Sequence, residues 1–341
     1  MMREQRGRWF NPPMLRIGVI GTGNIGTSHA RALASEVSGA EVGLVYDAER
    51  SRAEEVAHAV GAGVGASVEE VISSSDAVLI ASPDHLHAAQ ILLCLEAGLP
   101  TLCEKPLAPT VEEALGVVNA EVAFGRRLVS LGFMRRFDPG YRALKEALPS
   151  VGAPLIVHNA HRNAFAPYGL TTAGTLTNSA IHELDINRWL LDDEYATVQV
   201  IAGRRAPDAP EGEFDPILVV LTTRRGVIVE IEAFITAHYG YEVSCQVVCT
   251  EGVLDMGDGG FLTRTSQGVR GQPIPELWLG RFGEAYRAEL QAWVDAAQAG
   301  TTSGATAWDG LVATMTANAA VASVNRGPQN IELPQQPALY R

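Results

Sequence analysis

Short apolar runs alternate with amphipathic stretches along the first third of the chain. Runs of about five apolar residues separated by helical patterns are what a parallel sheet with helices on both faces requires. The predicted strands are residues 15–20, 41–46, 77–81, 100–103 and 128–131, and the predicted helices are 25–35, 50–60, 68–73 and 110–124. The pattern therefore predicts an α/β domain with a doubly wound parallel sheet.

The pattern changes near residues 148–152, after which longer strands alternate apolar and polar positions. The predicted strands are 155–160, 196–202, 216–222, 227–234 and 242–249, and the predicted helices are 179–191, 283–299 and 308–325. Turn signals such as Arg224-Arg225-Gly226 predict that consecutive strands form hairpins. We therefore expect an α+β domain with an open, mostly antiparallel sheet in the second half.

Charge and composition exclude several classes of protein. The 341 residues carry 26 Lys and Arg against 39 Asp and Glu, a formal net charge of −13. This charge repels phosphate backbones and anionic lipid, so neither nucleic acid nor a membrane is an expected partner. The four cysteines form no Cys-x-x-Cys pair, which favours buried thiols of a reducing compartment over a disulfide or metal site. Residues 1–13 lack the apolar core of a secretory signal, so we expect a disordered extension on a cytoplasmic protein.

A glycine motif follows the first predicted strand directly and opens the first predicted helix. In Gly21-Thr-Gly23-Asn-Ile-Gly26, the first glycine permits a tight turn, the second lets the backbone approach a pyrophosphate, and the third lets helix and strand pack closely. The amides of the helix N-terminus then face the phosphate oxygens. The predicted cofactor-binding positions of this loop are Gly21, Gly23, Asn24, Ile25 and Gly26.

Asp47 ends the second predicted strand about 20 residues after the glycine motif, where a carboxylate can accept hydrogen bonds from a ribose diol. A carboxylate at this position repels a 2′-phosphate, so NAD is favoured over NADP. Arg50 and Arg52 lie just downstream and weaken this preference. The alternative is a glycine turn followed by an ordinary helix-capping aspartate.

A lysine loop, Cys103-Glu-Lys105-Pro106, follows the fourth predicted strand. Ligands of open α/β sheets bind at the carboxyl ends of the strands, so Lys105 is expected where a nicotinamide would lie. Pro106 restricts Lys105 to an extended backbone and permits a cis peptide bond. The ammonium would orient a substrate oxygen and stabilise alkoxide charge. On spacing alone, a solvated loop lysine is an equally good interpretation.

Asn178, His182 and Asp185 are spaced i, i+4 and i+7 on a predicted helix. At about 100° per residue they share an arc of roughly 60° on one face. Polar side chains on a packed helix need partners, and a bound polyol would supply them. His182 suits proton exchange with a hydroxyl near neutral pH. The alternative is helix capping by Asn178 beside a core histidine.

Two further histidines, His85 and His87, follow Ser82-Pro-Asp. They could suggest a zinc site, but a Pro-Asp sequence that opens a helix explains the stretch more simply. We therefore expect no metal.

In this order, the glycine loop, Glu104-Lys105-Pro106 and His182-Glu-Leu-Asp185 resemble the glucose-fructose oxidoreductase/inositol dehydrogenase (Gfo/Idh/MocA) family. The strings 132–138, 160–163, 181–185 and 239–241 are most similar to the bacterial inositol dehydrogenases of that family. The resemblance covers residues 15 to about 334. It implies a Rossmann domain at 14–135, a substrate-binding and oligomerisation domain at 136–330, a C-terminal tail at 331–341, and NAD as hydride acceptor. It also implies a homo-oligomer, commonly a tetramer joined through sheet faces.

The resemblance also assigns roles residue by residue. The family's catalytic lysine and histidine match Lys105 and His182. Its ligand-contacting positions match Arg135, Asn163, Asp185, Tyr241 and Tyr286, and the positions that line the nicotinamide side match Ser82 and Glu104.

Asn178 departs from the family, because the inositol dehydrogenases carry an aspartate there. An aspartate stabilises an imidazolium by charge, whereas an amide only hydrogen-bonds it. The difference is expected to cost about a few kcal/mol of transition-state stabilisation unless Asp185 or another carboxylate substitutes. Residues 164–173 also depart, so the identity of the polyol stays open.

The expected function is NAD-dependent oxidation of a secondary hydroxyl of a cyclic polyol, such as myo-inositol or a related inositol, to the ketone. An aldose, a sugar nucleotide or an aminocyclitol is an alternative substrate, since the family spans all of these. A further alternative, motivated by Asn178, is an NAD-binding regulatory protein with little turnover.

Overall fold

The computed structural model describes residues 14–166, 169–256, 263–266 and 268–341. The extension predicted at 1–13 therefore lies outside the described residues. Among those described, no helix is both long and apolar enough to cross a bilayer. All four cysteines are free and buried, which confirms the expectation of buried thiols.

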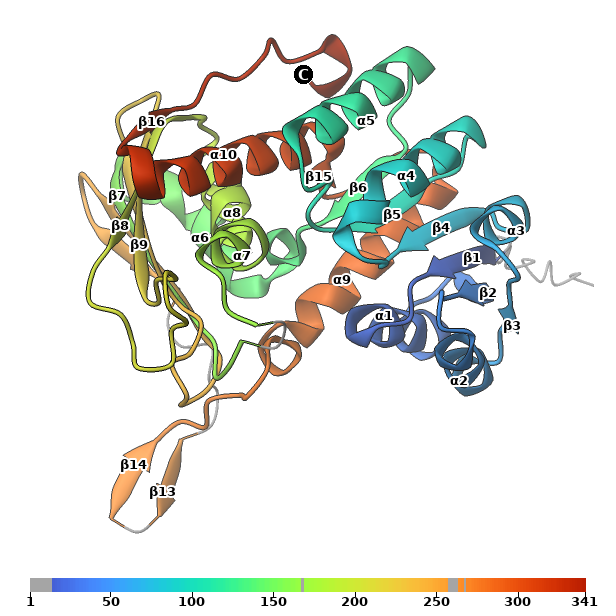
Figure 1. Cartoon of the computed structure of the whole chain (residues 1–341), viewed down its shortest axis with the longest axis horizontal. Coiled ribbons are helices and arrows are strands. Elements are labelled where there is room, and N and C mark those ends of the chain that lie inside the picture. Colours follow the sequence, from blue (N-terminus) through green and yellow to red (C-terminus); the bar gives the residue numbers. More distant parts are fainter. Residues whose placement is uncertain (1–13, 167–168, 257–262, 267) are drawn as a thin grey trace, which may run out of the picture.

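The first domain is built on a seven-stranded sheet with the order β15-β6-β5-β4-β1-β2-β3. Its parallel strands are β1 (Leu15–Ile20), β2 (Ala40–Tyr46), β3 (Gly63–Val64), β4 (Ala77–Ile80), β5 (Thr101–Glu104) and β6 (Val129–Gly132). The helices between them are α1 (Asn24–Ser35), α2 (Arg50–Val60), α3 (Val68–Ser73), α4 (His87–Glu96) and α5 (Val111–Phe124). The strand order reverses direction at β1, which creates the crevice where such sheets bind ligands. The predicted doubly wound α/β domain is confirmed (Figure 1).

The second domain carries another seven-stranded sheet, with the order β12-β11-β7-β10-β9-β8-β16. Its strands are β7 (Pro154–Arg162), β8 (Tyr195–Ala202), β9 (Ile217–Thr223), β10 (Ile228–Phe234), β11 (Glu242–Cys249), β12 (Val253–Asp255) and β16 (Gln329–Asn330). A separate hairpin consists of β13 (Arg264–Ser266) and β14 (Val269–Gly271). Residues 224–226 join β9 and β10 as the predicted hairpin. By contrast, β10 and β11 form no hairpin, because β7 lies between them and runs parallel to β10.

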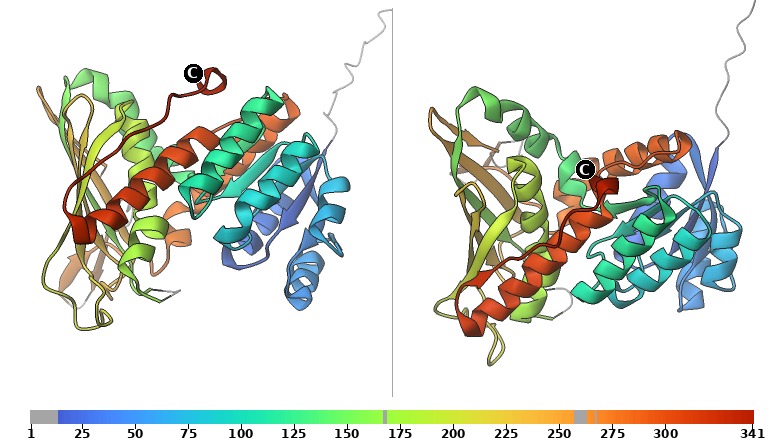
Figure 2. Two further views of the ribbon diagram at one scale, coloured as in Figure 1. Left: turned by 45° about the horizontal axis from the view of Figure 1, so that its top comes forward. Right: turned by 90° about the horizontal axis from the view of Figure 1, so that it is seen from above.

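Helices of the second half cover the inner face of this sheet and reach the first domain. They are α6 (Pro139–Ala147), α7 (Thr172–Gly174), α8 (Ile181–Leu191), α9 (Trp278–Gln298) and α10 (Ala307–Arg326). Figure 2 shows α9 and α10 running from the second sheet across to the first. Leu290, Trp293 and Val294 of α9 pack with α1 and α2 in the first core. The short strand β15 (Ala305–Thr306) pairs antiparallel with β6. The last third of the chain therefore contributes to both cores, while the boundary expected at residue 135 stays a prediction.

The outer face of the second sheet carries ion pairs as well as an exposed apolar side chain. Arg162 on β7 pairs with Glu232 on β10 and with Glu242 on β11. Ile228 on the same face is exposed. Assembly through this face stays a prediction.

Candidate active site

The glycine loop between β1 and α1 is held by close contacts of two of its glycines. Gly21 has φ +94°, and a Cβ there would lie 2.4 Å from the carbonyl oxygen of Ala81. A Cβ on Gly26 would lie 2.0 Å from the carbonyl oxygen of Gly21, so helix and turn approach too closely for any side chain. Gly23, in contrast, faces open space. The first turn of α1 carries no acidic side chain. Its free amides therefore suit a pyrophosphate over Gly23.

Asp47 follows β2 and fixes the glycine loop from the side. Its Oδ2 accepts hydrogen bonds from the amide and hydroxyl of Thr22 at 2.7 and 3.0 Å, and its Oδ1 accepts one from the amide of Glu49 at 2.9 Å. Burial raises the pKa of Asp47, but these hydrogen bonds outweigh it and hold the pKa below its usual value. The carboxylate is therefore charged at neutral pH, and Oδ1 keeps capacity for a further donor.

Lys105 projects from the end of β5 toward the second domain. Its peptide bond to Pro106 is cis. The Nζ atom donates to the side-chain oxygen of Asn178 at 2.7 Å and to its backbone oxygen at 3.0 Å. Burial lowers the pKa of Lys105, and the nearby negative charge of Glu104 offsets part of this effect. Lys105 is thus a positioned group at the domain boundary, and the alternative of a solvated loop lysine is wrong.

Glu104 is the buried residue just before this lysine. Its Oε1 lies 2.7 Å from Nε2 of His29 on α1, and its Oε2 accepts from the amide of Lys105 at 3.2 Å. Although burial raises the pKa of Glu104, His29 holds it below the usual value. Tyr286, one of the predicted substrate residues, packs edge-on against His29 with ring centroids 5.4 Å apart.

His182 lies in the first turn of α8 and is buried. Its Nδ1 has no hydrogen-bond partner among the described residues. Burial lowers the pKa of His182 well below its usual value, and the positive charges of Lys105 and Arg135 lower it further. The ring is therefore neutral near pH 7, which is the form that can accept a proton.

The predicted helical stripe of Asn178, His182 and Asp185 does not form. Asn178 lies in a π-helical turn (Thr175–Ser179) that precedes α8, and its side chain caps no helix. Asp185 is turned toward Arg136, which donates to its two carboxylate oxygens at 2.9 and 2.5 Å. Protein groups therefore already partner Asn178 and Asp185, and contact of a polyol with this helix stays a prediction.

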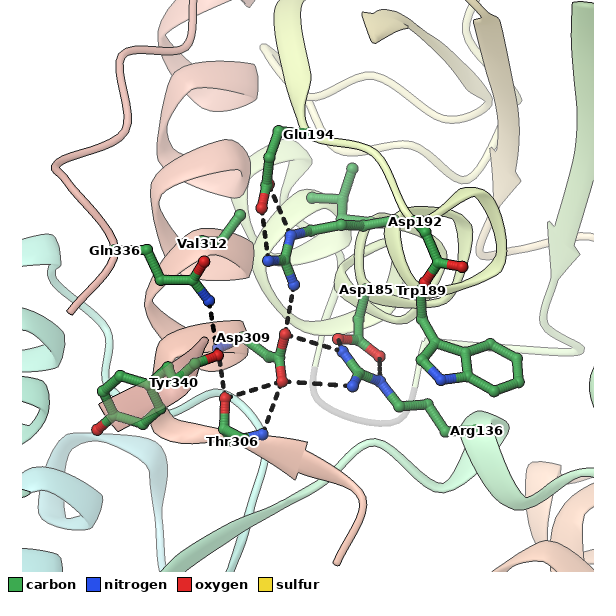
Figure 3. Close-up of polar contacts among 12 residues, drawn as sticks. Arg136, Asp185, Trp189, Asp192, Glu194, Thr306, Asp309, Val312, Gln336 and Tyr340 are labelled. Atoms are coloured by element: carbon green, nitrogen blue, oxygen red, sulfur yellow. Dashed lines mark hydrogen bonds and ion pairs between the residues drawn. The ribbon is translucent and has the colours of Figure 1, made fainter. Parts of the chain in front are cut away.

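The ion pair of Asp185 is part of a larger network at the junction of the domains (Figure 3). Asp309 on α10 accepts from Arg136 at 3.3 Å and pairs with Arg188 of α8. Arg188 also binds Glu194 in a bidentate pair. The network joins α8 to α10, and so fixes the helix that carries His182.

Arg135 and two residues without a predicted role form a buried cluster beneath the site. Arg135 pairs with Glu183, and Glu183 also accepts from Nδ1 of His161 at 2.9 Å. All three are less than 3% exposed. The sequence signal for His161 was its inward position on the alternating strand β7, two residues before Asn163. For Glu183 no signal is evident besides its proximity to His182.

The other predicted substrate residues border this cluster. Tyr241 packs edge-on against His161, and burial raises its pKa to about 12. The side-chain oxygen of Asn163 is buried without a partner in the part of the chain that the structure describes, as is Nε of Arg135. Unsatisfied buried polar atoms are rare, so each of these two atoms indicates a place where a hydroxyl group of a ligand can bind.

Ser82 and His87 shape the loop after β4. The Ser82 hydroxyl donates to the side-chain oxygen of Gln90 at 2.6 Å. The two ring nitrogens of His87 lie 2.7 and 2.9 Å from the backbone oxygens of Pro106 and Ser82. His87 thereby ties the β4 loop to the lysine loop, and this contact accounts for its position without a metal.

Two family models match the chain. One, described as the NAD-binding Rossmann fold of an oxidoreductase family, matches residues 15–133, and its partner, the C-terminal alpha/beta domain, matches residues 145–333. The chain belongs to the Gfo/Idh/MocA oxidoreductase family. The resemblance inferred from the motifs is thereby confirmed, as are its Rossmann and C-terminal folds.

Individual members of the family are similar over nearly the whole chain. The inositol 2-dehydrogenase of Paracoccus denitrificans is 44% identical over 96% of this chain and 99% of its own, and that of Cereibacter sphaeroides is 45% identical over the same shares. Among solved structures, the myo-inositol dehydrogenase of Lactobacillus casei in complex with NAD(H) and myo-inositol has a TM-score of 0.92 at 34% identity. It covers 96% of this chain and 100% of its own.

Proposed function

We propose that this protein is an NAD-dependent dehydrogenase of the cytoplasm that oxidises a secondary hydroxyl of myo-inositol, or of a related inositol, to the ketone. The observation that carries the proposal is the meeting of the two domains at Lys105. Its ammonium lies 2.7 Å from Asn178, one turn before the buried, neutral His182. The 44–45% identity to inositol 2-dehydrogenases supports the choice of substrate.

The residues present fit a dinucleotide, since Gly23 leaves open space before the N-terminus of α1 and Asp47 keeps an acceptor free. Bound NAD supplies the acceptor for the hydride that leaves the carbinol carbon. We assign removal of the hydroxyl proton to His182, whose neutral ring is the competent base. Lys105 holds the same oxygen and stabilises its developing negative charge. Asn163, Tyr241 and the Arg135 cluster would contact the remaining hydroxyls.

NAD rather than NADP is the proposed cofactor, because the charged Asp47 would lie against a 2′-phosphate. Asp47→Ser removes that repulsion, and Arg50 and Arg52 stand nearby to attract the phosphate. We expect the ratio of kcat/KM for NAD over NADP to fall by about tenfold or more, because each 1.4 kcal/mol of repulsion is a factor of ten. An unchanged ratio would contradict the assignment of Asp47 to the ribose.

The experiment that tests the function measures NADH absorbance with a panel of inositol isomers, aldoses and aminocyclitols. Turnover of inositols but not aldoses is expected. Lys105→Ala should lower kcat/KM by about a hundredfold or more while NAD still binds, since positioned electrostatic groups contribute effects of that size. Lys145, the only other lysine of the chain, is the matched control. Because Lys145 is a half-buried residue of α6 that binds Asp192 and Trp189, Lys145→Ala should leave kcat/KM unchanged.

Other outcomes of this panel would identify the alternatives. Preferred turnover of an aldose, sugar nucleotide or aminocyclitol would reassign the substrate within the family. NAD binding with no turnover of any compound, indifferent to Lys105→Ala, would favour a regulatory protein. Homo-oligomerisation is proposed separately, and sedimentation as a monomer at micromolar concentration would refute it.

A further inference from the structure

Asp84 is a half-buried carboxylate in the loop that follows β4, and the proposed mechanism does not use it. It begins a short 3-10 helix (Asp84–Leu86) ahead of α4, and no side-chain capping bond is made at the start of either helix. The Pro-Asp sequence opens this helix as predicted, and the Asp84 carboxylate makes its contact elsewhere. Its Oδ2 accepts from the side-chain nitrogen of Asn178, across the domain boundary, at 3.4 Å.

Asn178 consequently lies between a cation and an anion. Its side-chain oxygen faces the ammonium of Lys105 at 2.7 Å, and its side-chain nitrogen faces Asp84. Opposite charges at the two ends fix the orientation of the amide, because reversing it would set oxygen against carboxylate and nitrogen against ammonium. The amide dipole is then aligned to carry the influence of the Asp84 charge toward Lys105.

The other carboxyl groups near the site are either engaged or uncharged among the described residues. Glu289 on α9 has no hydrogen-bond partner there, but burial raises its pKa well above its usual value, so it carries no negative charge at neutral pH. Glu104 is engaged by His29 and by a backbone amide, and Asp185 is engaged by Arg136 on both oxygens. We propose that Asp84 is a positioning residue that supplies, through the amide of Asn178, a negative charge that acts on Lys105. The proposal rests on the catalytic role assigned above to Lys105.

The arrangement predicts how the two positions depend on each other. Asn178→Asp alone would bring two carboxylates into contact, and like charges at such a distance destabilise each other. It should therefore give no gain in turnover. Asp84→Asn alone removes the charge behind Asn178, so Lys105 keeps the field of Glu104 but loses that of Asp84. The double variant, Asp84→Asn with Asn178→Asp, exchanges amide and carboxylate, and should restore activity.

The test is a cycle of kcat and KM measurements on the four enzymes with myo-inositol and saturating NAD, across pH. Asp84→Asn should lower kcat by about tenfold, the size of a 1.4 kcal/mol loss of charge interaction. KM for NAD should stay unchanged. The double variant should recover most of the loss. Asp76→Asn is the matched control, because Asp76 lies at the opposite end of β4 and its carboxylate accepts a hydrogen bond from the backbone amide of Arg16.

The pH profile distinguishes a charge effect from a packing effect. The charged or titratable groups whose fields act on Lys105 and His182 are Glu104, Asp84, Arg135 and His161. The negative charge of Asp84 raises the pKa of Lys105. In Asp84→Asn that pKa should fall, so the alkaline limb of the kcat–pH profile should move to lower pH. The double variant should return the limb toward its original position.

Any one of three results would overturn the inference. The first is a kcat for Asp84→Asn equal to that of Asp76→Asn, and the second is a kcat for the double variant no higher than that of Asp84→Asn. The third is a kcat–pH profile of Asp84→Asn whose alkaline limb coincides with that of the wild type. Failure of the function itself is recognised separately, because wild-type enzyme would then not oxidise inositols, or Lys105→Ala would remain as active as wild type.

Discussion

Substitution of Asp309 tests how much the ion-pair network at the junction of the two domains contributes to stability. Asp309 occupies the third position of α10, where it forms a capping box with Thr306. The same carboxylate pairs with Arg136 and Arg188. Helix α5 carries a second capping box, formed by Thr110 and Glu113, that is exposed and has no ion pair among the described residues. The Asp309 box therefore differs from the Glu113 box in its burial and in its two arginine partners.

The magnitudes follow from this comparison. Losing a capping contact costs about 1 kcal/mol, and breaking a buried ion pair by removing one partner costs about 3–5 kcal/mol. Because Arg136 and Arg188 each keep another carboxylate, the lower value applies. Asp309→Ala should therefore lower the free energy of unfolding by about 4 kcal/mol, and Glu113→Ala by about 1 kcal/mol.

The assay is equilibrium unfolding in urea, with the free energies of both variants compared to that of the wild type. Burial raises the pKa of Asp309, but Arg136 and Arg188 outweigh it and hold the pKa well below its usual value. The stabilisation is therefore fully present above the unfolded value of about 3.9 and is lost as pH falls through the lowered pKa. Equal losses for Asp309→Ala and Glu113→Ala at pH 7 would refute the argument that this network holds the junction.

Two further predictions concern the base and the C-terminal tail. Because the pKa of His182 is lowered by burial and by nearby positive charges, the acid limb of kcat/KM should lie below the usual imidazole value of about 6.5. A limb above that value would contradict a neutral buried base. The buried Tyr340 donates its hydroxyl to Glu121. Tyr340→Phe should therefore cost about 1–3 kcal/mol in urea unfolding, since Glu121 loses a buried partner. No loss would mean that the tail contributes little to stability.

The sequence predicted local features of the fold well, because those features depend on short-range periodicity. The predicted helices at 50–60 and 68–73 coincide with α2 and α3, and the predicted strand 242–249 coincides with β11. Periodicity carries no information on which strands pair. The insertion of β7 between β10 and β11, and the return of β15 to the first sheet, were therefore not predicted.

The candidate site, like the fold, was predicted where it depends on local sequence motifs and not where it depends on tertiary contacts. The motifs placed Lys105 and His182 at the junction of the domains, but equal helical spacing suggested a stripe that the π-helical turn at Asn178 breaks. The ion pair between Arg136 and Asp185 joins residues 49 positions apart. Such partners depend on tertiary packing, so the engagement of Asp185 could not be recognised from its position on the helix.

The most direct test of the proposed chemistry is a crystal structure of this enzyme with NAD and myo-inositol bound. The account predicts one carbinol oxygen within hydrogen-bond distance of both Nζ of Lys105 and the ring of His182, with its carbon facing the nicotinamide ring. A polyol whose hydroxyls contact only one of these groups, or neither, would contradict the proposed chemistry.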